Sequence, residues 1–281
     1  MKHSHLRAAV NAAVFLVVTG GLLPFYLAAT PFGARARRVF SYPFFKTCLL
    51  LTGISVRPLG PRSKGSGVLY VANHVSYLDI PIFGALNDAA FVAKSEVRGW
   101  PLFGFLAKIS RTVFVSRQTT NLRAEQGEIG TRLAEGESMF LFPEGSSSAG
   151  VGVLPFRAGL LSAARSDETR PISVQPVSIV YGPHIADRPG LTRAERDCYA
   201  WYGHMDMLPH LWRLFGTAEK VVVAVQYHTP RRSDEFANTR ELTQWAERAV
   251  AHGLRQVMLS EVRAREDTPA TIRFLEGDFS F

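Results

Sequence analysis

Cysteine is scarce in this chain: its 281 residues include two, Cys48 and Cys198, which lie far apart in the sequence. Neither belongs to a CxxC pair or stands beside other metal-ligand residues, so zinc and redox chemistry have little support. This cysteine usage does not call for an oxidising compartment. Internal repeats and low-complexity tracts are also lacking. The length therefore indicates one large domain with a sizeable core.

Charge is missing from residues 8–34, an apolar stretch that is long enough to cross a bilayer. Three interpretations compete: a membrane anchor that spans or half-enters the bilayer, a cleaved signal peptide behind Lys2 and Arg7, or a buried helix of a soluble protein. A second apolar stretch, residues 39–54, carries four aromatic side chains and Lys46, which suits the headgroup zone of a membrane. We therefore expect a membrane anchor.

The formal net charge is +8. A basic protein meets nucleic acid, anionic lipid or an anionic substrate. No recognised nucleic-acid motif is present, and much of the positive charge lies near the apolar stretch. Arg35, Arg37 and Arg38 follow that stretch directly, which favours the cytoplasmic side for the chain after it. We expect a membrane, and no nucleic acid, among the partners.

Short apolar runs alternate with amphipathic stretches from Val68 onward. This alternation predicts an α/β fold, a mixed sheet flanked by helices, behind an N-terminal hydrophobic membrane-associated helical segment. The expected parts are a membrane-proximal segment at 1–56, an α/β domain at 57–265 and a C-terminal tail at 266–281. The expected strands are Val68–Ala72, Ala90–Ala93, Thr112–Val115, Ser138–Phe142, Ile172–Val180 and Val221–Gln226.

Helices are expected at Asn121–Glu135 and within Ser233–Arg263, where apolar residues recur at helical spacing. The segment 57–67 has the composition of a polar turn. Pro176 lies inside an expected strand, and because proline has no N–H group it marks an edge, a bulge or a strand start.

The most informative segment is Asn73-His74-Val75-Ser76-Tyr77-Leu78-Asp79. It follows directly on an apolar run, which places His74 at the carboxyl end of a strand, where open α/β sheets gather ligands and chemistry. A histidine held by a carboxylate can take a proton from a hydroxyl group. A His and an Asp at this spacing also arise by chance, so the remaining motifs have to support the interpretation.

A polar loop opens after the expected strand 138–142, with Glu144, Gly145 and Ser146 at its start. Glycine lets the backbone approach a ligand closely, and serine hydroxyls and turn amides can hydrogen-bond a polar head group. The same residues also fit an ordinary Gly/Ser loop.

Three cations flank expected strands: Lys94, Arg111 and Arg117. Together they offer a pocket for phosphate or carboxylate, although each alone fits a solvated surface.

Residues 199–212 are dense in aromatics, which fits an apolar channel or, more simply, a packed loop and helix. They include His204, Asp206 and His210. Because no carboxylate or cysteine cluster stands beside these three, we expect no metal site.

Together these blocks resemble the glycerolipid acyltransferase family, which includes 1-acylglycerol-3-phosphate acyltransferases. NHVSYLD (73–79) is similar to the family's His-x4-Asp block, and KSEVRGWPLFG with TVFVSR (94–104 and 112–117) to its second block. FPEGSSS (142–148) is similar to the third and VQPVSI (174–179) to the fourth. The four blocks occur in the family's order and cover residues 68–180.

The resemblance implies a role for each matching residue. His74 is the general base that deprotonates the acceptor hydroxyl, and Asp79 orients it. Glu144 and Gly145, with Ser146, shape the acceptor site, and Arg117 binds an acceptor anion. The acyl donor is a thioester of coenzyme A or acyl-carrier protein, with no cofactor and no metal. The implied place is the inner (cytoplasmic) membrane, with the catalytic domain facing the cytoplasm.

The chain departs from the family pattern at two positions. The third block commonly reads Glu-Gly-Thr-Arg, but Ser146 and Ser147 stand in the last two places. The second block usually has glycine where this chain has Arg111. A charged hydrogen bond is worth about 1.5–3 kcal/mol, so either Arg111 compensates for the missing arginine or the acceptor lacks a phosphomonoester.

These departures leave two acceptors open. The expected function is a membrane-bound O-acyltransferase that converts 1-acyl-sn-glycerol-3-phosphate to phosphatidate. The alternatives are a lyso-ornithine lipid O-acyltransferase and a catalytically inactive lipid-binding relative, against which the intact pair of His74 and Asp79 argues.

Overall fold

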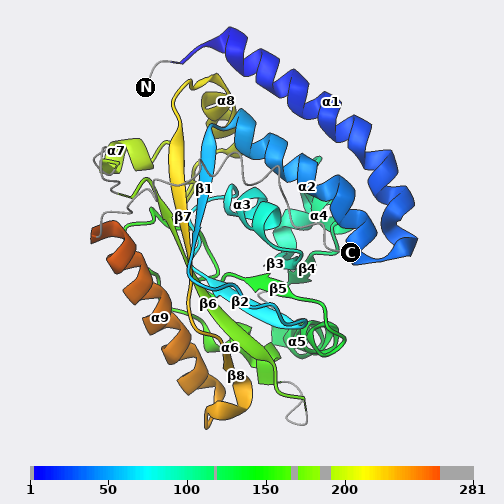
Figure 1. Ribbon diagram of the computed structural model, residues 1–281, viewed down its shortest axis with the longest axis vertical. Helices are drawn as coiled ribbons and strands as arrows, with labels where there is room; N and C mark the ends of the chain where they lie inside the picture. Colours follow the sequence, from blue (N-terminus) through cyan, green and yellow to red (C-terminus); the bar gives the residue numbers. More distant parts are fainter. Residues whose placement is uncertain (1–2, 117–118, 166–169, 184–190, 260–281) are drawn as a thin grey trace.

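The computed structural model describes residues 3–116, 119–165, 170–183 and 191–259. Its centre is an eight-stranded sheet in this part of the chain, with the order β1–β7–β6–β2–β5–β3–β4, while β8 pairs with β6 (Figure 1). The strands are β1 (Ile54–Leu59), β2 (Val68–Ala72), β3 (Ala90–Lys94), β4 (Val113–Val115), β5 (Met139–Leu141), β6 (Ser173–Tyr181), β7 (Val221–Tyr227) and β8 (Arg231–Arg232).

The strands run in both directions. Strands β6, β2, β5, β3 and β4 are parallel to one another, whereas β7 and β8 run antiparallel to β6, and β1 is parallel to β7. The prediction of an α/β fold with a mixed sheet flanked by helices is confirmed. All six predicted strands are present with small shifts at their ends.

Strand β1 was not predicted, because Arg57 and Pro58 gave residues 57–67 the composition of a turn. The structure places residues 54–59 beside β7 and no other strand, at the edge of the sheet. An edge strand has one unpaired side, so it accommodates a proline that a central strand would exclude.

Of the three positions expected for Pro176, an edge, a bulge or a strand start, the edge and the start are excluded, because β6 is a central strand and Pro176 lies opposite Val71 of β2. The Pro176 carbonyl accepts a hydrogen bond from the His228 N–H at 3.0 Å. The proline nitrogen therefore faces the same side, where β7 has ended at Tyr227 and β8 has not begun. The missing N–H falls at an interruption of the neighbouring ladder.

Helices cover both faces of the sheet. One face packs against α2 (Ala34–Leu51), α3 (Asp79–Leu86) and α8 (Met207–Gly216), and the other against α5 (Thr119–Ala134), α6 (Ala158–Leu161) and α9 (Thr239–Leu259). Along β2 the side chains alternate between the two resulting cores, and all five are buried. Two short helices, α4 (Phe103–Ile109) and α7 (Arg193–Arg196), are also present.

Helices α5 and α9 confirm the two helices predicted from periodicity. Helix α9 begins later than expected because Ser233–Glu235 forms a separate 3₁₀ turn. The predicted tail at 266–281 lies outside the described residues.

Helix α1 (His5–Ala29) forms an antiparallel hairpin with α2 and lies on the outside of the domain, with α9 on the opposite side of the sheet (Figure 1). The helical segment His5–Phe32 is the one span of the described residues that is long and apolar enough to cross a membrane, and 17% of its apolar window is buried. Phe15 packs against Phe215 of α8, and the Asn11 side-chain amide donates to the Phe215 carbonyl at 2.8 Å. The helix is therefore docked along one side and exposed along the other.

Arg38 joins the hairpin to the sheet domain. Its guanidinium donates to the carbonyl oxygens of Gly84, Ala85 (3.1 Å) and Asn87 (2.7 Å) at the end of α3. Cations at a helix C-terminus are favourable, because the last carbonyl groups lack partners within the helix. Arg38, one of the three arginines that follow the apolar stretch, is thus partly buried and bonded to the protein.

Candidate active site

Asn73 fixes the place where β2 ends. Its side chain is fully buried and bonds both ways to β6: the amide donates to the Ile179 carbonyl at 3.0 Å, and the Ile179 N–H donates to the amide oxygen at 2.9 Å. The Asn73 side chain thereby makes the two hydrogen bonds to β6 that the backbone of a further strand residue would otherwise make. His74, the next residue, leaves the sheet at its carboxyl edge, as the sequence predicted.

Asp79 is fully buried at the first turn of α3, where the helix dipole favours negative charge. Its Oδ1 accepts a hydrogen bond of 2.7 Å from the Tyr181 hydroxyl. Its Oδ2 accepts from three donors: His74 Nδ1 at 2.7 Å, Val75 N at 2.8 Å and Ser76 N at 3.2 Å. With both oxygens hydrogen-bonded, the buried carboxyl group is held in one orientation.

The His74 ring is clamped between this carboxylate and an aromatic side chain. It stacks on Phe142, with 4.3 Å between ring centroids and 23° between planes, and its side chain is 20% exposed. Because Asp79 accepts from Nδ1, that nitrogen carries the proton and Nε2 keeps a free lone pair. The accessible nitrogen is therefore a base.

Glu144 lies beneath His74 rather than beside a solvent-facing pocket. The side chain is 2% exposed, and its Oε1 accepts from the His74 N–H at 3.3 Å. Burial raises the pKa of Glu144 to about 8, against which the hydrogen bond from the His74 N–H acts. Its Oε2 is buried without a hydrogen-bond partner among the described residues. The carboxyl group therefore supports the backbone of the base.

The loop after β5 wraps around His74. The Ser148 N–H donates to the His74 carbonyl at 2.9 Å, and Gly145 turns the chain at φ +68°, a conformation that glycine adopts without strain. Ser146 is half-buried within this loop. The Arg157 side chain, which sequence reasoning did not single out, lies directly over Gly145.

The predicted cations are not all at the same place. Lys94 ends β3 and lies level with the end of β2, at the edge of the sheet that carries His74. Arg111 precedes β4 and so lies at the opposite edge, where it pairs with Glu137 at 3.1 Å. Its expected part in the acceptor site is therefore not supported. Arg117 lies outside the described residues.

Comparison with known proteins adds to this geometry. A family profile described as Acyltransferase matches residues 53–180. A lyso-ornithine lipid O-acyltransferase of Rhizobium meliloti (strain 1021) is 32% identical over 272 residues, which cover 94% of this chain and 90% of that protein. The chain belongs to the acyltransferase family. The resemblance of the four sequence blocks is thus confirmed, and with it the expectation of a glycerolipid acyltransferase, an enzyme that transfers acyl groups.

Two further proteins extend the comparison. A 1-acyl-sn-glycerol-3-phosphate acyltransferase of Neisseria meningitidis (serogroup B, strain MC58) is 33% identical over 162 residues, 57% of this chain and 63% of that protein. The crystal structure of a 1-acyl-sn-glycerophosphate acyltransferase from Thermotoga maritima superposes with a TM-score of 0.63 at 22% identity, covering 91% of this chain and 95% of the other. The second likeness establishes the fold.

An aromatic wall stands beside the base of this acyltransferase. Tyr77 packs edge-on against Trp201, which packs edge-on against Trp100, and the backbone N–H of Trp201 donates to the Val75 carbonyl at 3.0 Å. The Tyr77 hydroxyl bonds His210 Nδ1 at 2.8 Å, and burial lowers the pKa of His210 to about 4. His210 is thus a neutral packing partner, and no cluster of three potential metal ligands occurs within the described ranges.

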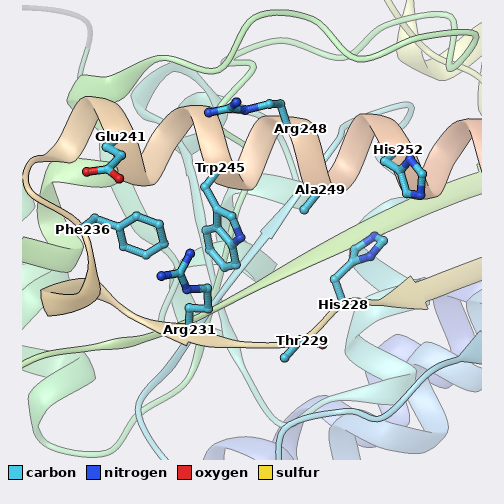
Figure 2. A pocket seen from close by; sticks show the side chains of 9 residues that line it. All are labelled: His228, Thr229, Arg231, Phe236, Glu241, Trp245, Arg248, Ala249 and His252. Carbon is cyan, nitrogen blue, oxygen red and sulfur yellow. The ribbon is translucent and has the colours of Figure 1, made fainter.

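A separate groove lies between α9 and the chain that follows β7 (Figure 2). It has a volume of about 610 Å³. Arg231 lies against the rings of Phe236 and Trp245 and pairs with Glu235 at 2.8 Å, and His228 bonds Ser178 at 2.8 Å. Because β7 runs antiparallel to β6 and β2, its carboxyl end points away from His74. The groove is no extension of the active site.

Proposed function

We propose that this acyltransferase moves a fatty acyl group from an acyl thioester to the hydroxyl of lyso-ornithine lipid, with His74 as the general base. The observation that carries the mechanism is the 2.7 Å bond between His74 Nδ1 and Asp79 Oδ2. In the neutral imidazole this bond places the proton on Nδ1 and the lone pair on Nε2, and the carboxylate stabilises the imidazolium that forms.

The reaction balances without a covalent enzyme intermediate. His74 Nε2 takes the hydroxyl proton of the acceptor while the oxygen attacks the thioester carbonyl and forms a C–O bond. The tetrahedral intermediate then collapses, the C–S bond breaks, and the thiolate takes the proton from His74. The donor expected from the sequence, acyl-CoA or acyl-carrier protein, presents the same thioester group to this base, and no cofactor or metal enters the scheme.

Backbone N–H groups of the loop after β5 are suited to the oxyanion. In the described structure the N–H groups of Gly145 and Ser148 are occupied by the carbonyls of Phe142 and His74, whereas those of Ser146 and Ser147 have no protein acceptor. Donors held in place before the reaction stabilise developing charge efficiently. We assign Ser146 and Ser147 this role.

The choice of acceptor follows from the head group. An ornithine head group carries a carboxylate, whereas lysophosphatidate carries a phosphomonoester with a charge of about −1.5 to −2. The loop has lost the usual arginine at Ser147, and the relative that spans 94% of the chain is a lyso-ornithine lipid O-acyltransferase. Lysophosphatidate, which the sequence alone favoured, remains the second candidate, supported by the shorter match to the Neisseria enzyme.

Membrane association follows from the exposed side of α1. Leu6, Val10, Val17 and Phe25 are between 52% and 77% exposed, although they are large and apolar. Such a surface is costly in water and gains free energy in lipid. Because the other side of α1 packs on the domain, the helix lies in one leaflet of the inner membrane, with the catalytic domain on the cytoplasmic side.

Acyl transfer by the purified protein tests the acceptor. Lyso-ornithine lipid and lysophosphatidate are offered separately in mixed micelles, each with acyl-CoA and with acyl-carrier protein. We expect the kcat/KM for lyso-ornithine lipid to exceed that for lysophosphatidate by at least about tenfold, the value of one charged hydrogen bond. A preference of the same size for lysophosphatidate would make the second candidate the function.

A further inference from the structure

We propose that Arg157 holds the negative charge of the acceptor head group, in place of the arginine that the third family block usually carries at the position of Ser147. This inference rests on the proposed function and names the group that recognises its acceptor. Three features carry it: the place of the guanidinium over the catalytic loop, its freedom from other partners, and the match between its charge and a carboxylate.

The loop after β5 is shaped to receive the Arg157 side chain. A Cβ atom at Gly145 would lie 3.2 Å from Nε and 3.3 Å from Cζ of Arg157, so any larger residue at position 145 would crowd the guanidinium. The Arg157 N–H also donates to the Pro143 carbonyl at 3.0 Å. Arg157 therefore belongs to the catalytic loop in space, although it follows Gly145 by twelve positions in the sequence.

The same loop contacts the base directly. Glu144, next to Gly145, accepts from the His74 N–H at 3.3 Å, and Ser148 donates to the His74 carbonyl at 2.9 Å. A guanidinium that lies over Gly145 is thus adjacent to the residues that enclose His74. An acceptor whose hydroxyl reaches His74 brings its head group to this loop.

The backbone at Arg157 is held in place, whereas its guanidinium has no ion-pair partner within the described residues. The neighbouring Phe156 is 7% exposed, and its N–H donates to Glu247 Oε2 at 2.7 Å. The Arg157 side chain is exposed and, within the described residues, forms no hydrogen bond or ion pair. Arg111, in contrast, is paired with Glu137. A positioned but unpaired guanidinium binds an anion without first breaking another ion pair.

The charge of this group fits a monoanion. A guanidinium presents two parallel N–H groups that match the two oxygens of a carboxylate. One such cation balances the single charge of an ornithine carboxylate, whereas a phosphomonoester carries up to two charges and favours additional cations. Arg157 therefore recognises the head-group carboxylate.

The test combines one protein variant with one change in the acceptor. Arg157→Met is compared with Arg240→Met, a control at another exposed arginine, in the first turn of α9. Each is assayed with lyso-ornithine lipid and with its carboxamide, in which the carboxylate is replaced by a neutral group. We expect Arg157→Met to lower kcat/KM for the carboxylate about 10- to 100-fold, mainly through KM, and to leave the carboxamide rate unchanged. Arg240→Met should match wild type with both acceptors.

The wild-type enzyme provides a second test, which does not depend on whether the Arg157→Met variant folds. It should lose the same 10- to 100-fold when the carboxylate is replaced by the carboxamide, and Arg157→Lys, which keeps the charge but not the fork, should lie between wild type and Arg157→Met. Equal rates for the two acceptors in wild type, or a loss in Arg157→Met that is the same for both, would overturn the assignment.

A different result is expected if lyso-ornithine lipid is not the acceptor. In that case wild type turns over lysophosphatidate and not lyso-ornithine lipid, and Arg157→Met is then assayed with lysophosphatidate. A raised KM for that acceptor would support an anion-binding Arg157 on a different substrate, and an unchanged KM would refute it.

Discussion

The Tyr181 hydroxyl donates a 2.7 Å hydrogen bond to Asp79 Oδ1 from a position 102 residues further along the chain. Tyr181 ends β6, and its side chain is 1% exposed. The other oxygen of the same carboxylate holds His74. Tyr181 therefore acts on the base only through Asp79, as a positioning residue that completes the set of donors around a buried charge.

Replacing Tyr181 by phenylalanine leaves Asp79 Oδ1 without a partner in the core. The free energy of unfolding should fall by about 2 kcal/mol, because the lost hydrogen bond is to a charged group, and kcat should fall while the acceptor KM is unchanged. Denaturant unfolding and steady-state kinetics measure the two effects. Tyr227→Phe is the matched control, since the Tyr227 hydroxyl bonds the neutral Asn87 amide at 2.5 Å. Equal losses of kcat in both variants would contradict a role through Asp79.

Glu144 makes the stability of the protein depend on pH. Below its ordinary pKa of 4.5 the carboxyl is protonated in both the folded and the unfolded chain. Between 4.5 and about 8 the unfolded chain releases this proton and the folded chain keeps it, because burial raises the pKa. Unfolding therefore becomes easier as the pH rises through this range.

Glu144→Gln removes this dependence, because the amide does not ionise. The Tm of the variant relative to wild type should therefore increase steadily from pH 5 to pH 8, as measured by thermal unfolding in one detergent. A difference in Tm that stays constant across this range would mean that Glu144 is already ionised in the folded protein.

Arg111 adopts φ +60°, a left-handed conformation that glycine tolerates better than arginine. This explains why the family usually has glycine at the position, and it indicates that the arginine is a surface substitution. Arg111→Gly breaks an ion pair whose arginine is 47% exposed and relieves the backbone, so kcat/KM should stay within about twofold of wild type. A large loss of kcat/KM for either acceptor would indicate that Arg111 contributes to acceptor binding.

The exposed side of α1 gives a prediction for membrane binding. Val10→Asp with Val17→Asp should reduce sedimentation of the protein with anionic lipid vesicles, since both side chains are more than half exposed and apolar. Leu259→Asp, at an exposed apolar residue that ends α9, is the control and should bind like wild type. Equal binding by all three proteins would place the membrane contact elsewhere.

Local pattern predicted the parts of the site that are local in the sequence. The run 68–72 followed by Asn73 defined a strand end, so the position of His74 and its pairing with Asp79 followed from residues within one short segment. The partners of Asp79 from elsewhere could not be predicted. Tyr181 is one tyrosine in a buried strand, and nothing in its neighbours indicates that its hydroxyl bonds a carboxylate of α3.

The direction of each strand determines at which edge of the sheet the predicted cation next to it lies. Lys94 is the last residue of its strand and lies at the sheet edge that carries His74, whereas Arg111 precedes its strand and lies at the other edge. In a parallel arrangement these edges are opposite, so the order of cation and strand in the sequence already contained this distinction. Arg157 was missed for another reason: its contact with Gly145 depends on the course of the loop between them.

The most direct test of the account is acyl transfer by His74→Ala beside wild type, with His204→Ala as the control at an exposed histidine. The account predicts that His74→Ala loses about 10²- to 10⁴-fold in kcat, the contribution of a general base, while its Tm stays near that of wild type and His204→Ala remains fully active. A folded His74→Ala protein that keeps more than about a tenth of wild-type kcat would contradict the central claim that His74 deprotonates the acceptor.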